Sequence, residues 1–398
     1  MDIKPKVRGF ICASAHPTGC HQMVADMVNK VQRSGTFDGP KRVLVIGAST
    51  GYGLSSRITA AFGAQASTIG VFYERPPAEK RTASAGWYNS AAFEKIAHQS
   101  GLYAKSINGD AFSHDLKKQV VELIQKDWDG QVDLLIYSLA SPRRVDPDSG
   151  EVYQSCLKST DKLYQSKSVD PIRGVFKEVE IEPASEEDIK NTIAVMGGDD
   201  WRLWIEALND AKVLASGFQT LAYSYIGPKL TYPIYYHGSI GRAKADMLAK
   251  VDGIRSILAP INGDAWVSVN KAVVTQASAA IPVVPLYISV LFEKMQAKGL
   301  HEDCIEQMIR LFKDRLYSGA PVEVDDRGRI RIDDWEMQED IQAEVAACWE
   351  ELDAENLNEK VDLRLFQKAF YQLFGFEVEG VDYTQDTNPM VMIPSIDI

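Results

Sequence analysis

The stretch Arg42–Gly63, RVLVIGASTGYGLSSRITAAFG, joins an apolar run to a helical pattern through a glycine-rich turn. Residues 43–46 have the length and composition of a buried strand, and the apolar residues after Gly53 recur at helical spacing. A strand that ends in glycines and leads into a helix directs backbone N–H groups and the helix N-terminus at one place. Gly47 permits a tight turn, Gly51 permits close approach of the backbone, and Gly53 lets the helix pack on the sheet. The stretch therefore predicts a cradle for a dinucleotide pyrophosphate.

The spacing G-x-x-x-G-x-G differs from the common fingerprint G-x-G-x-x-G, and glycines alone are also compatible with a turn that binds no ligand. The next strand-like run, 68–73, leads into Glu74. A carboxylate at this position accepts hydrogen bonds from the adenosine ribose hydroxyls and repels a 2′-phosphate. The neighbouring Arg75 partly offsets that repulsion. NADH is therefore favoured over NADPH, and a Walker loop is excluded because no Gly-Lys-Ser/Thr follows.

Short β-rich runs alternate with helical patterns through most of the chain. This alternation is typical of βαβ units, in which a parallel sheet carries helices on both faces. Because crossovers between parallel strands are right-handed, the pattern predicts an α/β fold with a doubly wound parallel sheet of the Rossmann type. The expected strands are 43–46, 68–73, 103–107, 132–138, 221–226 and 267–274, and the expected helices include 90–98, 115–128 and 243–258.

The segment 142–219, between the fourth and fifth expected strands, is too long for a simple crossover. It contains a strand-like alternation at 175–181 and a helix start at Ser185, where Ser185 and Asp188 match the capping-box pattern. We therefore expect an inserted element beside the sheet, on the substrate side.

Both ends of the chain are expected to pack on the same body, so that residues 1–398 form a single Rossmann-like domain. Residues 320–398 are an acidic C-terminal extension with a helix expected over 336–352, and a strand-like segment lies at 7–13. The apolar stretch Ala277–Phe292 is interpreted as a buried helix, one face of which can line an acyl-chain pocket.

The composition limits the classes of partner. The chain has 398 residues, 45% of them hydrophobic and 25% charged, which is ordinary for a globular protein. Its net charge of −12 argues against a nucleic-acid partner, which needs a basic surface. No apolar run reaches the roughly 18 residues of a membrane span, since Pro282 and Pro285 interrupt the longest candidate. Five scattered cysteines suit a cytoplasmic protein, and their spacing predicts no metal site.

A nicotinamide enzyme that reduces a carbonyl or a conjugated carbonyl needs a hydrogen-bond donor where charge develops on the substrate oxygen. A tyrosine serves where a nearby lysine cation lowers its pKa and binds the ribose. The stretch Thr231–Lys244, TYPIYYHGSIGRAK, places Tyr235 nine residues before Lys244. Nine helical steps would put the two on opposite faces, so they converge only if Tyr235 lies outside the helix, with Ser239 as the helix N-cap. Aromatic packing beside an exposed lysine is the alternative interpretation.

Tyr-x8-Lys together with Gly-Ala-Ser-Thr-Gly-Tyr-Gly resembles the FabV-type trans-2-enoyl-CoA and enoyl-acyl-carrier-protein reductases, a divergent branch of the short-chain dehydrogenase/reductase superfamily. The resemblance extends over essentially the whole chain. It implies NADH-dependent reduction of the trans-2 double bond of enoyl-CoA or enoyl-acyl-carrier-protein thioesters, the last reductive step of fatty-acid elongation, by a monomer without stable membrane insertion. Further matching stretches are Arg8–Cys12, Gly86–Phe93, Ile107–Phe112, Tyr137–Arg144, Lys271–Ser278 and Phe374–Phe376.

The resemblance also implies residue roles. Tyr235 would donate the proton, Lys244 would bind the cofactor, and Tyr225 would contact the thioester carbonyl. Ser224 beside Tyr225 leaves a ketone or alcohol reductase of the same superfamily open, and a third alternative is an NAD-binding regulatory protein that has lost catalysis. The residues implied to hold NADH/NAD are Gly47, Ala48, Ser49, Thr50, Gly51, Tyr52 and Gly53 at the pyrophosphate, Tyr73 and Glu74 at the adenosine ribose, Asp110 and Ala111 at the adenine, Leu139 and Ala140 on the ribose side, and Val273, Val274 and Thr275 at the nicotinamide.

Overall fold

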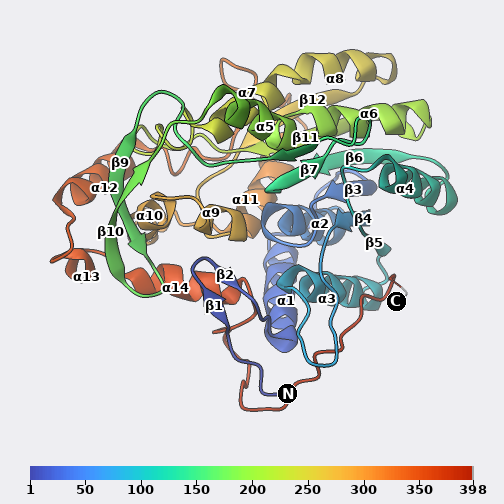
Figure 1. Ribbon diagram of the computed structural model, residues 1–398. Helices are drawn as coiled ribbons and strands as arrows, with labels where there is room; N and C mark the ends of the chain where they lie inside the picture. Colours follow the sequence, from blue (N-terminus) through green and yellow to red (C-terminus); the bar gives the residue numbers. More distant parts are fainter. Residues whose placement is uncertain (397–398) are drawn as a thin grey trace.

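The computed structural model describes residues 1–396, which fold around a seven-stranded sheet in the order β13-β12-β11-β6-β3-β4-β5 (Figure 1). Every neighbouring pair of strands is parallel. The chain runs outward from β3 to β5 and then returns to β6 on the other side of β3, which confirms the predicted doubly wound α/β sheet. The strands are β3 (Arg42–Ile46), β4 (Ser67–Phe72), β5 (Ala104–Asn108), β6 (Val132–Tyr137), β11 (Leu214–Ser224), β12 (Asp264–Val269) and β13 (Ile330–Arg331).

Helices cover both faces of the sheet, and for this reason its central strands are apolar throughout. In β3, Leu44 and Ile46 pack in one cluster with helices α4, α6 and α8, whereas Val43 and Val45 pack in the cluster on the opposite face. The layer on the first face consists of α4 (His114–Asp127), α6 (Asp199–Asp210), α7 (Ser239–Ala249) and α8 (Val251–Leu258), and the second layer includes α1 (Pro17–Arg33), α2 (Gly51–Gly63), α3 (Ala85–Gln99) and α11 (Cys304–Arg310).

Between β6 and β11 the chain forms two antiparallel hairpins and a helix before α6 (Figure 1). The predicted strand 175–181 is confirmed as β10, and Ser185 and Asp188 form the predicted capping box. The fifth sheet strand begins at Leu214 rather than 221, so residues 214–219 belong to the sheet and not to the insertion; a bulge between Leu214 and Gln219 hid the strand period. The elements are β7 (Arg143–Val145), β8 (Val152–Gln154), β9 (Tyr164–Asp170), β10 (Val175–Ile181) and α5 (Glu186–Met196).

Both ends of the chain lie against the same body. The predicted strand 7–13 is instead a short hairpin of two-residue strands, β1 (Val7–Arg8) and β2 (Ile11–Cys12). The extension contributes the edge strand β13, and its last residues return along α3, where Trp87 Nε1 donates to the carbonyl of Val391 (2.9 Å). Its helices are α12 (Glu339–Glu351), α13 (Leu357–Lys360) and α14 (Leu363–Gln372).

Further predicted elements differ from the structure. The helix expected over 243–258 is divided into α7 and α8, and the strand expected over 267–274 ends at Val269, so 270–274 form a loop. The helix expected within Ala277–Phe292 is interrupted, because Pro282 cannot donate a helical hydrogen bond and Val283 has a φ of +73°. The chain instead forms α9 (Gln276–Ala279) and α10 (Val284–Ala297), and a 3-10 turn (Ala259–Ile261) and a π-helical turn (Leu311–Leu316) complete the helices.

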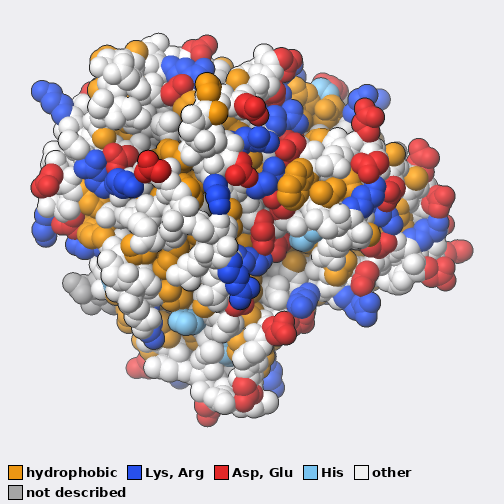
Figure 2. Space-filling view, turned by 180° about the vertical axis from the view of Figure 1, so that it is seen from behind, with side chains coloured by type: hydrophobic (Ala, Val, Ile, Leu, Met, Phe, Trp, Pro, Cys, Tyr) orange, Lys and Arg blue, Asp and Glu red, His pale blue; other side chains and the backbone are white. Residues whose placement is uncertain are grey.

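Acidic and basic side chains are interspersed over the face seen in Figure 2. Within residues 1–396, no helix is long and apolar enough to cross a membrane, and no group of histidine, cysteine and acidic side chains is placed to hold a metal ion.

Candidate active site

A cavity of about 610 Å³ opens at the carboxyl ends of the central strands. Doubly wound sheets bind ligands at this edge, because the strand order reverses there and the loops diverge. The cavity is lined by the start of α2, by the loops after β6, β11 and β12, and by α7 and α9. The predicted site residues that line the cavity are Thr50, Gly51, Tyr52, Leu139, Ala140, Tyr225, Tyr235, Lys244, Val273 and Thr275.

The glycine-rich turn has the geometry of a phosphate cradle. Gly47 has a φ of +84°, and a Cβ there would lie 2.2 Å from the carbonyl oxygen of Ser138; a Cβ at Gly53 would lie 1.9 Å from that of Gly47. The N–H groups of Gly47 and Ala48 already bind the carbonyl of Val71. These residues therefore shape the turn, whereas residues 50–52 line the cavity itself.

The predicted adenosine residues follow the ends of β4 and β5, outside the cavity lining. Ser49 Oγ donates to Glu74 Oε1 (2.6 Å), so the carboxylate is tied to the glycine-rich turn. The Asn108 side chain, which the sequence analysis missed, brackets the Glu74 backbone: its Oδ1 accepts from Glu74 N (2.7 Å) and its Nδ2 donates to Glu74 O (2.9 Å). Tyr73 is 82% exposed, Asp110 is exposed, and Ala111 is buried. The ends of three neighbouring parallel strands, β3, β4 and β5, thus bring these residues to one edge of the sheet.

Tyr235 and Lys244 both line the cavity. As the spacing requires, Tyr235 lies in the turn before α7, outside the helix. The N-cap is Gly238 rather than Ser239, because Ser239 Oγ is used elsewhere: it donates to the carbonyl of Cys156 in the insertion (2.6 Å). The start of the helix is therefore set by contact with the insertion.

Burial dominates the electrostatics of this pair. It raises the pKa of the Tyr235 phenol above its ordinary value, so the predicted lowering by Lys244 is wrong for this structure. Burial also lowers the pKa of Lys244 to about 8. The Lys244 Nζ donates to the carbonyl of Tyr223 at 2.8 Å. The phenol therefore stays protonated at neutral pH, as a proton donor must.

The Tyr225 ring packs edge-to-face against Tyr235, with 4.8 Å between the ring centroids. Its hydroxyl lies 2.9 Å from Glu336 Oε1, an oxygen that also accepts from the Tyr287 hydroxyl (2.6 Å). Sequence reasoning found no sign of a role for Glu336 or Tyr287. Glu336 begins the helix expected over 336–352 in the acidic extension, and Tyr287 lies in the stretch expected as a buried helix. No local pattern could connect them to Tyr225, since Glu336 is 111 residues away.

The loop after β12 forms another wall of the cavity. Val273 and Thr275 line it, whereas Val274 is buried beside them. Asn270 also lines the cavity, and its buried Nδ2 has no hydrogen-bond partner among the described residues. An orphaned amide donor and a cradle too tight for any Cβ both fit a bound nicotinamide dinucleotide.

Comparison with known proteins agrees with this geometry. A family model described as the trans-2-enoyl-CoA reductase catalytic region matches residues 81–317, and one described as the NAD(P)H binding domain of trans-2-enoyl-CoA reductase matches residues 2–79. The chain belongs to the trans-2-enoyl-CoA reductase family. The predicted family is thus confirmed.

Relatives and solved structures match over the full chain. Enoyl-[acyl-carrier-protein] reductase [NADH] of Flavobacterium johnsoniae is 57% identical over 100% of both chains, and that of Coxiella burnetii is 55% identical over 100% of this chain and 98% of the relative. The trans-2-enoyl-CoA reductase of Clostridium acetobutulicum in complex with NADH has 41% identity and a TM-score of 0.96, with both chains covered completely. The Treponema denticola enzyme in complex with NAD has 44% identity and a TM-score of 0.94, also over 100% of both chains.

A third family model, described as an enoyl reductase FAD binding domain, matches residues 324–387. The residues present there do not fit a flavin dinucleotide. They form the edge strand β13 and three helices, and within 324–387 there is no glycine-rich turn from a strand into a helix to hold a pyrophosphate. The residues that line the central cavity also come from outside this segment. We therefore derive no chemistry from a flavin.

Proposed function

We propose that this protein reduces the trans-2 double bond of 2-enoyl thioesters to the saturated acyl thioester, with NADH as the reductant. The observation that carries the proposal is the pair of buried phenols, Tyr225 and Tyr235, in the same cavity as the dinucleotide cradle. Both phenols are held protonated by burial, which raises their pKa values. The family and its full-length relatives support the same reaction.

NADH, when bound, supplies a hydride for the β-carbon of the substrate. Negative charge then develops on the thioester oxygen as the enolate forms, and hydroxyl donors aimed at that oxygen stabilise it. We assign this contact to Tyr225, assisted by Tyr235. Tyr235 then delivers a proton to the α-carbon, which gives the saturated product.

For the cofactor, we propose that the predicted residues keep their roles. Gly47–Gly53 would hold the pyrophosphate, Glu74 with Tyr73 the adenosine ribose, and Asp110 with Ala111 the adenine. Leu139 and Ala140 would lie on the ribose side, and residues 273–275 would hold the nicotinamide. The protonated Lys244 would bind the nicotinamide ribose. This arrangement is supported by the position of these residues along one edge of the sheet.

The acyl chain would occupy the apolar part of the cavity. Ile281, Val284 and Ile288 line it from the α9–α10 segment, and each is buried or nearly so. These side chains of the stretch predicted to line an acyl pocket thus belong to the cavity wall. A thioester of CoA or of acyl carrier protein would enter from the open side, and we propose a monomeric, cytoplasmic enzyme.

The test is a steady-state assay of NADH oxidation with crotonyl-CoA, with acetoacetyl-CoA and without acceptor. We expect turnover with crotonyl-CoA alone; reduction of acetoacetyl-CoA would indicate a ketone reductase, and no turnover a regulatory protein. Tyr235→Phe should lower kcat by about 10²-fold or more with unchanged NADH binding. Tyr232→Phe, a matched tyrosine of the same turn outside the cavity lining, should stay active. A largely active Tyr235→Phe enzyme would refute the assigned role.

A further inference from the structure

Glu336 is a fully buried carboxylic acid in contact with Tyr225, the tyrosine assigned to the thioester oxygen of the substrate. Its Oε1 contacts the hydroxyls of Tyr225 (2.9 Å) and Tyr287 (2.6 Å), and its Oε2 accepts from the backbone N–H of Ala272 (2.7 Å). Ala272 lines the cavity within the loop after β12. Glu336 therefore connects the C-terminal extension to both sides of the site.

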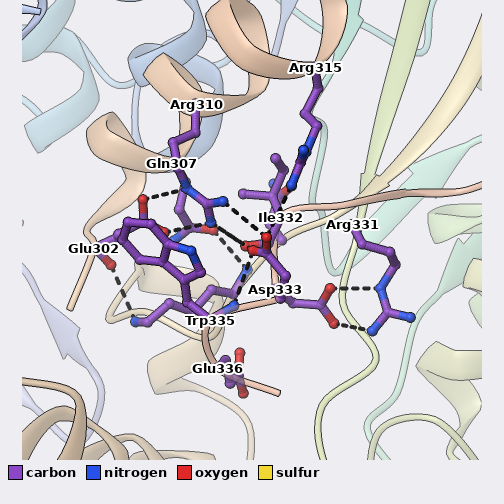
Figure 3. Close-up of polar contacts among 12 residues, drawn as sticks. Glu302, Gln307, Arg310, Arg315, Arg331, Ile332, Asp333, Trp335 and Glu336 are labelled. Carbon is purple, nitrogen blue, oxygen red and sulfur yellow. Dashed lines mark hydrogen bonds and ion pairs between the residues drawn. The ribbon is translucent and has the colours of Figure 1, made fainter. Parts of the chain in front are cut away.

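No basic side chain among the described residues forms an ion pair with Glu336. Figure 3 shows the neighbouring guanidinium groups directed at other carboxylates. Arg331 pairs with Asp333 (2.6 Å), and Lys271 Nζ donates to the backbone carbonyls of Ala272 (2.9 Å) and Glu302 (3.3 Å). Arg310 and Arg315 both pair with Asp334 (2.9 and 3.1 Å). A buried carboxyl without a counter-ion favours its neutral form, and burial does raise the pKa of Glu336.

The protonation state of Glu336 decides where the Tyr225 proton points. Tyr287 accepts from Gln342 Nε2 (3.2 Å), so its own proton is available to Glu336 Oε1. Tyr225 has one proton and two acceptors that compete for it: Glu336 and the substrate oxygen. If Glu336 were ionised, its carboxylate would accept the Tyr225 proton. Tyr225 would then face the developing enolate with its oxygen lone pairs and no proton. A protonated Glu336 instead donates to Tyr225 and leaves its proton free for the substrate.

We propose that Glu336 is a positioning residue that acts through Tyr225: as the neutral acid it donates a hydrogen bond to the Tyr225 hydroxyl and so directs the phenol proton at the thioester oxygen. This inference rests on the proposed function, because it takes Tyr225 as the contact of that oxygen. It also assigns a role to the segment 324–387 that involves no flavin.

The experiment compares kcat for crotonyl-CoA in four single variants, one of them a control, and one double variant. Glu336→Gln keeps a neutral donor of the same shape, and we expect kcat within about threefold of the wild type. Glu336→Met removes the donor at similar length, and we expect a loss of about 10²-fold, similar to Tyr225→Phe. Added to Tyr225→Phe, Glu336→Met should cost no further kcat, since both act on one hydrogen bond. Asp333→Asn, a buried acid of the same segment that pairs with Arg331, is the control and should keep kcat.

The outcomes separate the inference from the proposed function. If Tyr225→Phe retains full kcat, the assigned role of Tyr225 fails. If Tyr225→Phe is impaired but Glu336→Gln is equally impaired, the neutral-donor role is overturned while the proposed function stands. An equal loss from Glu336→Met in the presence and absence of Tyr225 also overturns it. Should Glu336→Met not fold, Glu336→Gln alone decides: retained kcat supports the role, and loss overturns it.

Discussion

Raising the pH through the pKa of Lys244 should release the cofactor without unfolding the protein. Burial lowers this pKa to about 8. The ammonium is then about nine-tenths charged at pH 7 and about one-tenth charged at pH 9. Because the charged form is assigned to the cofactor ribose, we expect kcat/KM for NADH to fall about tenfold over that interval.

Protein stability should move in the opposite direction. An unfolded lysine titrates near pH 10.4, so between pH ~8 and ~10.4 the unfolded chain binds more protons at this residue than the folded chain. The contribution of Lys244 to the free energy of unfolding therefore increases with pH as the activity decreases. Tyr235 does not cause the loss, because burial raises its pKa and the phenol stays protonated.

The measurement is kcat/KM for NADH at saturating crotonyl-CoA and constant ionic strength, together with a urea unfolding curve at each pH. Lys244→Arg is the matched control, since a guanidinium keeps its charge across this range. Its activity can be lower, but its profile should be flat from pH 7 to 9. A flat wild-type profile, or the same decline in Lys244→Arg, would refute the reasoning.

Three further predictions concern the glycine-rich turn, the C-terminal extension and the choice between NADH and NADPH. Gly47→Ala should lower the free energy of unfolding by ~2 kcal/mol or more and raise KM for NADH, because φ is +84° and the new Cβ would meet the carbonyl oxygen of Ser138 at 2.2 Å. Ser395→Ala should lower the free energy of unfolding by about 1–3 kcal/mol in urea titrations, because Ser395 Oγ donates to the buried Glu94 (2.7 Å). Glu74→Gln should lower KM for NADPH about tenfold, because it removes a charge that repels the 2′-phosphate while its amide oxygen can still accept from Ser49.

Each of these has a control or a contradicting result. Gly101 also has a positive φ (+72°), but no atom lies within 4 Å of a Cβ placed there. Gly101→Ala should therefore lower the free energy of unfolding only by the backbone strain, about 1–2 kcal/mol. If Gly47→Ala and Gly101→Ala lowered the free energy of unfolding equally, the clash between the new Cβ of residue 47 and Ser138 would be contradicted. Ser100→Ala, at the exposed end of α3, should change stability by less than about 0.5 kcal/mol. An unchanged ratio of NADPH to NADH activity in Glu74→Gln would remove that carboxylate from cofactor selection.

Features that depend on neighbours in the chain could be predicted from the sequence. The strand, turn and helix of 42–63 follow from a buried run, glycines and helical spacing, and the capping box at Ser185 needs only residues three apart. The spacing of Tyr235 and Lys244 also required the tyrosine to lie outside the helix, as it does. Local chemistry decides these features, because their hydrogen bonds and packing form within a few residues.

Only the tertiary structure decided the polar contacts between distant segments. Glu336 reaches Tyr225 across 111 residues, and Ser395 reaches Glu94 across 301. Glu336 and Glu94 are both fully buried, which no neighbour in the sequence indicates. The tertiary environment also determines the pKa values of the site. The pKa of the Tyr235 phenol is set by burial and not by Lys244. A carboxyl or phenol takes its protonation state from the groups that pack around it, and these groups meet only when the sheet and both ends of the chain have assembled.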